Sequence, residues 1–330
     1  MIMAKKLMEE VRDALRVKGY ALGTERQYMT WIRRYVRFHL PAHPRDVREE
    51  GVKRYLTYLA VECNVSPATQ NQCLAALLFL YRLLGIDLGD VTAICARKDK
   101  RVPAVLTEDE VMRLLEQLDG VYRIMAQIMY GGGLRLMECL RLRVKDLDMQ
   151  NLTITLIDTK GNSDRVTCLP ASAVPALTLH LAKVKAIHTE DLANGLGEVE
   201  MPHALGKKYP RAAWEWGWQY VFPAAVLSKD PRSGRIGRHH IFETSIQRAI
   251  KTAARKAGIA KLCGPHTLRH CFATHLLKQG TNIRQIQELL GHKKLETTMI
   301  YTHIEGASEV KSPLDRQLRT PFIRRALVES

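Results

Sequence analysis

The segment PHTLRHCFATHLLKQG, residues 265–280, places several basic side chains along a stretch whose apolar residues have helical spacing. The basic residues are His266, Arg269, His270 and His275. Cations near the start of a helix favour an anionic ligand, because the N–H groups of the first turn and the helix dipole also attract negative charge. Thr267 is a good N-cap residue, so we predict that the helix begins there with Arg269 in its first turn.

A zinc site is the first alternative, because His266 and His270 stand four residues apart. A metalloprotease helix of this kind also needs a glutamate next to its first histidine. Here Arg269 lies between the two histidines and would repel a metal ion. None of the seven cysteines forms a CxxC pair, which suits a reduced intracellular protein better than a metal knuckle. We therefore expect no metal.

Other residues that could do chemistry are spread along the chain. Arg135 and Glu138 stand three apart in GLRLME, on one side of a helix that follows three glycines. Lys160 lies in a turn between two β-rich runs. His292 follows the expected end of a helix, and Tyr301 lies on the next short one. Singly each is ordinary, since a turn lysine is usually solvated and a helical tyrosine usually packs in a core.

Together these residues suit a displacement at a phosphodiester. Arginine is a natural phosphate clamp, because its planar fork bonds two oxygens at once. Two arginines and two histidines could replace the metal ions of other phosphoryl-transfer enzymes, which agrees with the lack of clustered carboxylates. A tyrosine, whose pKa is about 10, would need a nearby base and a cationic field to attack. No GxxxxGK[ST] or dinucleotide fingerprint occurs, so ATP and NAD are not expected.

The elements that must position these residues are mostly helices. Three helical patterns open the chain, at about residues 28–36, 52–60 and 66–84, and arginines fall between the apolar positions of the first. The charged run ARKDKRVP, residues 96–103, reads as a linker. A capping box, Thr107 with Glu110, opens a second domain. One β-hairpin follows, and then helices dominate apart from a Gly-, Pro- and Trp-rich stretch at about 190–240. The expected fold is mainly α with a small antiparallel β-sheet, an α+β arrangement.

The charge balance favours a polyanionic partner, since 50 Lys and Arg against 34 Asp and Glu give a net charge of +16. A basic enzyme with a small anionic substrate is the alternative. The longest apolar run, residues 73–81, is far short of the ~20 residues that cross a bilayer. The first residues, MIMAKKLMEEV, contain no signal-peptide core. We expect a cytoplasmic protein without membrane contacts.

In their order along the chain, GLRLME, the turn lysine, HTLRH, LGH and YTH resemble the active-site set of the tyrosine recombinases. The resemblance implies that Arg135, Arg269 and His292 hold a scissile DNA phosphate. Tyr301 would attack it to form a 3′-phosphotyrosine, and Lys160 would protonate the departing 5′ oxygen.

The resemblance gives two further residues supporting roles. His266 would take part in proton transfer, and Glu138 would orient the cationic cluster without touching DNA. It implies no role for His270 and His275, which are expected to pack or to face solvent. Because the bond energy is kept in the phosphotyrosine, no ATP, metal ion or other cofactor is implied.

The resemblance also implies the domain plan and the assembly. Residues 1–95 would form a helical, SAM-like core-binding domain, 96–103 the linker, and 104–330 a catalytic domain with a C-terminal tail. The two domains would form a clamp around DNA. Since recombination makes two cuts in each of two sites, four protomers are implied, with the segment around Ser312 docking on a neighbour. The expected location is the bacterial cytoplasm, at the nucleoid.

Further motifs, GTERQYMTWIRRYVRFH, KYPRA, DPRSG, RHH and SPLD, resemble the integron integrase branch of that family. The branch carries an insert, here at about 190–221, and recombines gene cassettes at duplex attI sites and folded single-stranded attC hairpins. The insert would grip bases that protrude from the hairpin, and aromatic faces stack on such bases. The residues expected to do so are Trp214, Trp216, Trp218, Pro231, His239 and His240.

Three alternatives remain open. The tryptophans could fill a small core instead. The chain could be a Xer-like tyrosine recombinase acting on duplex DNA, a branch without the insert. It could also be a non-catalytic DNA-binding protein that uses its basic faces alone. Two departures from the family pattern stand out: Ser163 replaces a second turn lysine, and Gly132 replaces a Thr or Ser, which predicts a looser turn before Arg135.

Overall fold

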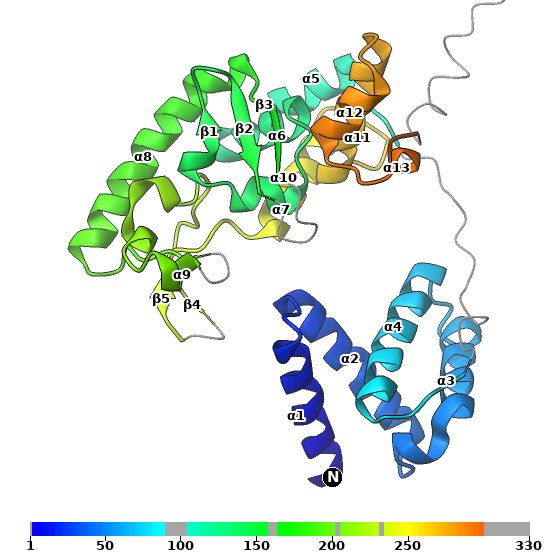
Figure 1. The fold of residues 1–330 in the computed structure, drawn as a ribbon. Helices are drawn as coiled ribbons and strands as arrows, with labels where there is room; N and C mark the ends of the chain where they lie inside the picture. Colours follow the sequence, from blue (N-terminus) through cyan, green and yellow to red (C-terminus); the bar gives the residue numbers. More distant parts are fainter. Residues whose placement is uncertain (1, 90–103, 158–163, 202–204, 231–233, 300–330) are drawn as a thin grey trace, which may run out of the picture. The chain divides into compact units, whose positions relative to one another are not determined.

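The computed structural model describes residues 2–89, 104–157, 164–201, 205–230 and 234–299. The chain divides into two compact units between Arg101 and Val102, and each unit is described by itself (Figure 1).

The first unit is a bundle of helices around one apolar core. Its helices are α1 (Ile2–Val17), α2 (Leu22–His39), α3 (Pro44–Val61) and α4 (Pro67–Leu83). Trp31, Ile32 and Tyr35 face the core from α2. The arginines of α2 lie exposed on its other side: Arg26, Arg33, Arg34 and Arg37. The helix is therefore apolar inward and cationic outward, as its sequence pattern predicts.

Local signals set the ends of these helices. Ser66 caps α4 by accepting a hydrogen bond from the Thr69 N–H, and Gly85 follows the helix with a φ of +69°. The three expected helices correspond to α2, α3 and α4. Helix α1 was not expected, although Leu7, Val11 and Leu15 are buried at four-residue spacing along it.

The second unit is larger and mixes helices with short strands. Its first half contains α5 (Glu108–Glu116), α6 (Gly120–Gly131), α7 (Leu136–Arg141), β1 (Leu147–Asp148), β2 (Thr153–Leu156), β3 (Arg165–Cys168) and α8 (Val174–Ala193). Its second half contains α9 (Leu205–Lys208), β4 (Ser228–Lys229), β5 (Ile236–Gly237), α10 (Glu243–Lys256), α11 (Pro265–Lys278), α12 (Ile283–Leu290) and α13 (Leu295–Met299). The capping box of Thr107 and Glu110 opens α5 as predicted.

A three-stranded antiparallel sheet of order β1-β2-β3 lies beside the helices. The expected hairpin is confirmed: β2 pairs with β3, and Leu156 stands opposite Arg165. A second, two-stranded sheet joins β4 and β5. The main core gathers apolar side chains of α5, α6, α7, α10 and α11. The predicted class, mainly α with small antiparallel sheets, is confirmed.

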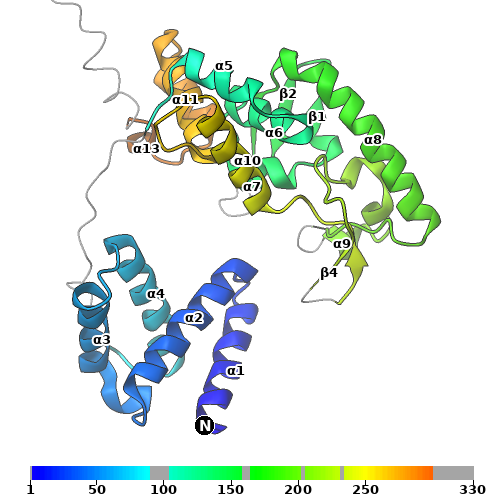
Figure 2. The same cartoon turned by 180° about the vertical axis from the view of Figure 1, so that it is seen from behind.

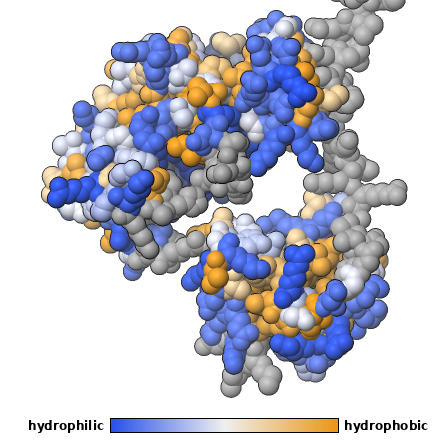
Figure 3. Space-filling model, viewed as in Figure 1, coloured by the Kyte–Doolittle hydropathy of each residue, from blue (hydrophilic) through white to orange (hydrophobic). Residues whose placement is uncertain are grey.

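Helix α8 runs past the three-stranded sheet (Figures 1 and 2). The segment with α9, β4 and β5 lies at the end of this unit that is far from α11, α12 and α13 in both views. Hydrophilic residues cover much of the face of each unit shown in Figure 3, with smaller apolar areas between them. Among the described helices, none combines the length and apolarity that a bilayer crossing requires.

One predicted boundary is wrong. Helix α11 begins at Pro265 with Gly264 as N-cap, and Thr267 is its third residue, whose hydroxyl accepts from the Gly264 N–H at 3.1 Å. Proline suits the first helical position because it lacks the N–H that would be unpaired there. Arg269 therefore lies one turn deeper in the helix than predicted.

Candidate active site

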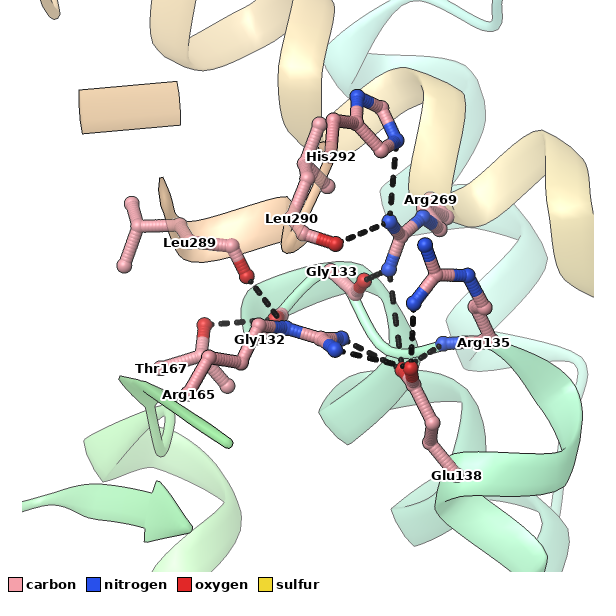
Figure 4. Close-up of polar contacts among 10 residues, drawn as sticks. All are labelled: Gly132, Gly133, Arg135, Glu138, Arg165, Thr167, Arg269, Leu289, Leu290 and His292. Atoms are coloured by element: carbon pink, nitrogen blue, oxygen red, sulfur yellow. Dashed lines mark hydrogen bonds and ion pairs between the residues drawn. The ribbon is translucent and has the colours of Figure 1, made fainter. Parts of the chain in front are cut away.

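Glu138 lies at the centre of a cluster of three arginines that come from distant parts of the chain (Figure 4). Its carboxylate lies 2.6 Å from Arg135 Nη1, 2.6 Å from Arg165 Nη2 and 3.7 Å from Arg269 Nη1. Burial alone would raise the pKa of this carboxyl, but hydrogen bonds and charge from Arg165, and then from Arg135, outweigh it and lower the pKa to about 2. The cluster therefore holds one negative and three positive charges at neutral pH.

Arg135 precedes α7 and is tied to it by Glu138. The Arg135 N–H donates to the Glu138 carboxylate at 2.7 Å, and its guanidinium donates to the same group at 2.6 Å. The Arg135 side chain is still 36% exposed, more than those of Arg165 and Arg269. It is thus the arginine of the cluster best placed to reach a ligand from solvent.

The glycines before Arg135 are required by close packing. Gly133 has a φ of +65°, and a Cβ there would lie 2.4 Å from Phe272 Cδ1. Its carbonyl accepts from Arg269 Nη1 at 2.5 Å. The looser turn predicted at Gly132 is not observed: its carbonyl accepts from Thr167 Oγ1 at 2.8 Å, and its N–H donates to Ile128 at 2.9 Å.

Arg269 is a buried cation on α11, only 4% exposed. Besides Gly133, its guanidinium donates to the carbonyl of Leu290 at 2.6 Å, at the end of α12. A second Nη2 contact reaches His292 Nε2 at 3.2 Å. These bonds satisfy a charge that would otherwise be costly to bury, and they fix the fork between α6, α11 and α12.

His292 lies one residue past Gly291, which ends α12 in the left-handed conformation as the sequence predicts. Because arginine can only donate, the contact with Arg269 makes His292 Nε2 the acceptor. The proton then sits on Nδ1, which lies 2.9 Å from Thr298 Oγ1 on α13. Burial, and then the charges of Arg269, Arg135 and Arg165, lower the pKa of His292 to about 4, so its ring is neutral at pH 7.

Arg165 completes the cluster and was missed from the sequence. Its guanidinium makes two bonds to Glu138, at 2.6 and 2.9 Å, and its Nε donates to the Leu289 carbonyl at 2.9 Å. An arginine next to a β-turn is usually solvated, so nothing local marks it. A usable signal was its place at the start of the strand after Lys160, which β-pairing brings back toward α6 and α7.

The other histidines of α11 lie in different surroundings. His266 is exposed in the first turn, one turn before Arg269. His270 is half-buried, and burial, then His266 and Arg269, lower its pKa. His275 is buried and bonds the Tyr130 hydroxyl at 2.8 Å and the Leu106 carbonyl at 2.9 Å, which is a packing role. Lys160, Tyr301 and Pro231 lie outside the described residues.

The predicted insert contains the three tryptophans, which differ in surroundings. Trp214 is 40% exposed, whereas Trp216 and Trp218 are half-buried. The Lys145 ammonium lies 4.4 Å from the centre of the Trp218 ring, and His188 lies beside Trp216. Trp214 is therefore the tryptophan with the most accessible surface for a stacked base.

The two histidines expected to grip a base also differ. His239 is half-buried, and its ring centre lies 4.0 Å from that of His240. His240 is only 8% exposed and packs edge-on against Tyr220. The His240 ring is therefore far less accessible than that of Trp214.

The insert is fixed to the rest of the unit by the buried Arg143, which follows α7. Its guanidinium carbon lies 3.7 Å from the centre of the Tyr220 ring. It also donates to the carbonyls of Trp218 at 2.9 Å and Glu200 at 2.8 Å. One buried cation thus joins both ends of the insert, through a cation–π contact and two charge-assisted hydrogen bonds.

Sequence comparison identifies the family. The sequence model of the phage integrase family matches residues 104–307, and that of the phage integrase N-terminal SAM-like domain matches residues 7–90. The chain therefore belongs to the phage integrase family, the tyrosine recombinases, and is a tyrosine site-specific recombinase.

Two similar relatives are named integrase/recombinase, one from Escherichia coli and one from Pseudomonas aeruginosa. Each is 46% identical over 94% of this chain and 93% of its own. Tyrosine recombinase XerD of Agrobacterium fabrum is 31% identical over 78% of this chain and 77% of its own. A lambda integrase dimer bound to a core site shares the fold, with a TM-score of 0.60 at 18% identity, covering 93% of this chain and 98% of that chain.

Proposed function

We propose that this recombinase is an integron integrase, which inserts and excises gene cassettes at duplex attI sites and folded single-stranded attC hairpins. The proposal has two parts that rest on different regions: the chemistry at the arginine cluster, and the recognition of protruding bases by the insert. We also propose that residues 1–95 are the core-binding domain, that residues 104–330 are the catalytic domain, and that the two form a clamp around DNA.

In the proposed chemistry, Arg135, Arg269 and His292 hold the scissile phosphate. The Tyr301 oxygen bonds to phosphorus and the bond to the 5′ oxygen breaks, which leaves a 3′-phosphotyrosine. Lys160 gives its proton to the 5′ oxygen, and His266 takes part in removing the proton of the phenol. The convergence of Arg135 and Arg269 on Glu138 supports this, because two cationic forks are already held in place for the charge on the phosphate.

In the proposed recognition, bases that protrude from the attC hairpin are received by Trp214, Trp216, Trp218, Pro231, His239 and His240. The observation that carries this step is the exposed Trp214 on an insert that Arg143 fixes to the catalytic unit. An aromatic face held in place loses little entropy when a base stacks on it, and stacking is worth ~1–3 kcal/mol per base.

The test is a covalent trapping assay with a bulged hairpin and a fully paired duplex of the same sequence, run in chelator. We expect the wild-type protein to form a denaturation-resistant DNA adduct and to prefer the hairpin. The Tyr301→Phe variant should bind both DNAs and form no adduct. An adduct that survives Tyr301→Phe would refute the proposed nucleophile.

A matched pair of variants tests the insert. Trp214→Ala should weaken hairpin binding by about 5- to 150-fold, which is the stacking energy above expressed as a ratio. Val226→Ala, which trims another exposed apolar residue, should bind as the wild type does. Equal loss with both variants would count against base stacking.

The second candidate is a Xer-like recombinase that acts on duplex DNA, and its support is the likeness to XerD of Agrobacterium fabrum. It predicts preference for the paired duplex in the same assay. Under either function the reaction joins two sites by two cuts each, so we propose that four protomers act together in the bacterial cytoplasm, at the nucleoid. Sedimentation of the protein with DNA that carries two sites would measure the number of protomers. An assembly of fewer than four would contradict this part of the proposal.

A further inference from the structure

The side chain of Arg165 is 7% exposed and is committed to protein acceptors. Both Nη atoms bond the Glu138 carboxylate, and Nε bonds the Leu289 carbonyl. Figure 4 shows the guanidinium between Glu138 on one side and the end of α12 on the other. A fork used in this way is poorly placed to clamp a phosphate, in contrast with that of Arg135, whose side chain is 36% exposed.

The contacts of Arg165 join the two halves of the site. Through Glu138 it reaches Arg135, whose N–H and guanidinium bond the same carboxylate. Through Leu289 it reaches α12, where the next carbonyl, that of Leu290, accepts from Arg269. A Cβ added at Gly291 would lie 2.8 Å from Arg165 Cδ, so the Arg165 side chain also packs against Gly291, the residue before His292.

The charges give this link a chemical consequence. Glu138 is the carboxylate of the cluster, and an ionised carboxylate competes with a phosphate for the Arg135 fork. Arg165 donates one N–H hydrogen bond to each Glu138 oxygen, at 2.9 and 2.6 Å, and so offsets much of that negative charge. Without Arg165, Glu138 would hold Arg135 more strongly and would also draw Arg269, which already lies within 3.7 Å.

We propose that Arg165 is a positioning residue for DNA cleavage: it occupies Glu138, which leaves Arg135 available to the phosphate, and it holds the end of α12, which places His292. It touches neither the phosphate nor the nucleophile. This role rests on the catalytic roles proposed above for Arg135 and His292. It also makes the strand that follows Lys160 part of the frame of the site, because Arg165 is the first residue of β3.

The experiment compares Arg165→Gln and Arg165→Lys with the wild-type full-length protein. It measures the first-order rate of adduct formation at saturating DNA, the DNA affinity and the thermal unfolding midpoint. Arg113→Gln is the matched control, since Arg113 is an exposed arginine with one backbone contact, at the Ala257 carbonyl. The DNA is the same bulged hairpin and paired duplex used for the wild type.

We expect Arg165→Gln to cleave about 10- to 100-fold more slowly with its DNA affinity little changed, by analogy with residues that orient metal ligands from behind. Arg165→Lys should recover part of the rate, because an ammonium neutralises Glu138 but cannot make the bidentate pair and the Leu289 bond together. Arg113→Gln should cleave at the wild-type rate.

A double variant separates positioning from simple folding. In Glu138→Gln/Arg165→Gln the carboxylate that would capture Arg135 is gone, so this double variant should cleave faster than Arg165→Gln alone. Because Arg165 and Glu138 are in direct contact, their losses are not expected to add even if the pair is purely structural, but a purely structural pair predicts no such recovery of the rate.

The pH profile gives a further readout. Arg165 faces His292 together with Arg135, Arg269 and His270. Removing this cation should raise the pKa of His292, so the limb of the cleavage profile that reports His292 should move to higher pH.

Wild-type cleavage by Arg165→Gln at saturating DNA would overturn this role and leave the proposed function intact. A double variant that cleaves no faster than Arg165→Gln, or an unchanged pKa of His292, would also overturn it. A wild-type protein that forms no Tyr301-dependent adduct would overturn the proposed function and, with it, the role of Arg165.

Discussion

Arg269 and His292 face each other with Nη2 3.2 Å from Nε2, and only the arginine can donate in that contact. The free enzyme therefore holds the histidine as a neutral acceptor. A phosphate oxygen that enters between the two would replace the histidine as acceptor for Arg269 and would also favour a proton on Nε2.

We expect the pKa of His292 to be far below 6.5 in the free protein, at about 4, and to rise when DNA binds. Nuclear magnetic resonance of the imidazole nitrogens would measure this pKa over a pH series. The sample is the Tyr301→Phe protein, with and without a hairpin substrate. An ordinary pKa in the free protein would show that the buried contact with Arg269 does not persist in solution.

Stability should fall as the solution becomes acidic, in two windows. Burial lowers the pKa of His292 and His240 to about 4, so the unfolded chain binds protons more readily between pH 6.5 and 4 and the free energy of unfolding drops there. Glu138 has its pKa lowered to about 2, so its contribution is present above pH 4.5 and disappears as pH falls toward 2. Urea denaturation at each pH would measure both, and Glu138→Gln should flatten only the lower window.

Removing Arg143 should uncouple the insert from the catalytic unit. Arg143→Leu leaves the carbonyls of Trp218 and Glu200 without their donor and removes the contact with Tyr220, at a cost of about 2–4 kcal/mol. Preference for the bulged hairpin over the duplex should shrink, while affinity for the duplex stays near its wild-type value. A gel-shift comparison measures both, and an unchanged preference would mean that the insert holds its own shape.

The close packing at Gly133 gives a clean test with an internal control. Gly133→Ala places a methyl group 2.4 Å from Phe272 Cδ1 and moves the carbonyl that accepts from Arg269, so both stability and cleavage should fall. Gly120 has a similar positive φ of +54°, and nothing lies within 4 Å of a Cβ added there. Gly120→Ala should therefore lower the free energy of unfolding only by the backbone strain of about 1–2 kcal/mol. Thermal melts and adduct yields distinguish the two; equal effects would remove the packing argument.

Much of the fold can be read from local patterns, because caps and hydrophobic periods act over a few residues. Ser66, Thr107 and Gly291 end or begin helices where the sequence places them. The start of α11 was misplaced because Thr267, a good cap by type, bonds Gly264 from the third helical position. Thr267 and Pro265 are both residue types that favour the start of a helix, and the helix begins at Pro265.

The site is only partly readable from the sequence, because its members meet through tertiary packing. Arg135, Glu138, Arg269 and His292 could be chosen from motif order, and the structure brings them together. Arg165 could not, since its contacts depend on β3 pairing with β2 and on α12 lying beside β3. The burial of His240 was hidden for the same reason: nothing local tells that Tyr220 and His239 cover it.

Helix α7 has six residues, with Arg135 as its N-cap and Arg143 two positions past its end. At 1.5 Å per residue it is a rod only about 9 Å long. Arg135 and Arg143 thus flank one short, rigid helix, with Leu142 in an extended conformation before Arg143. An insertion or deletion within α7 would displace the guanidinium of the arginine cluster and the one that contacts Tyr220 together, so we predict that such changes are among the least tolerated in the enzyme.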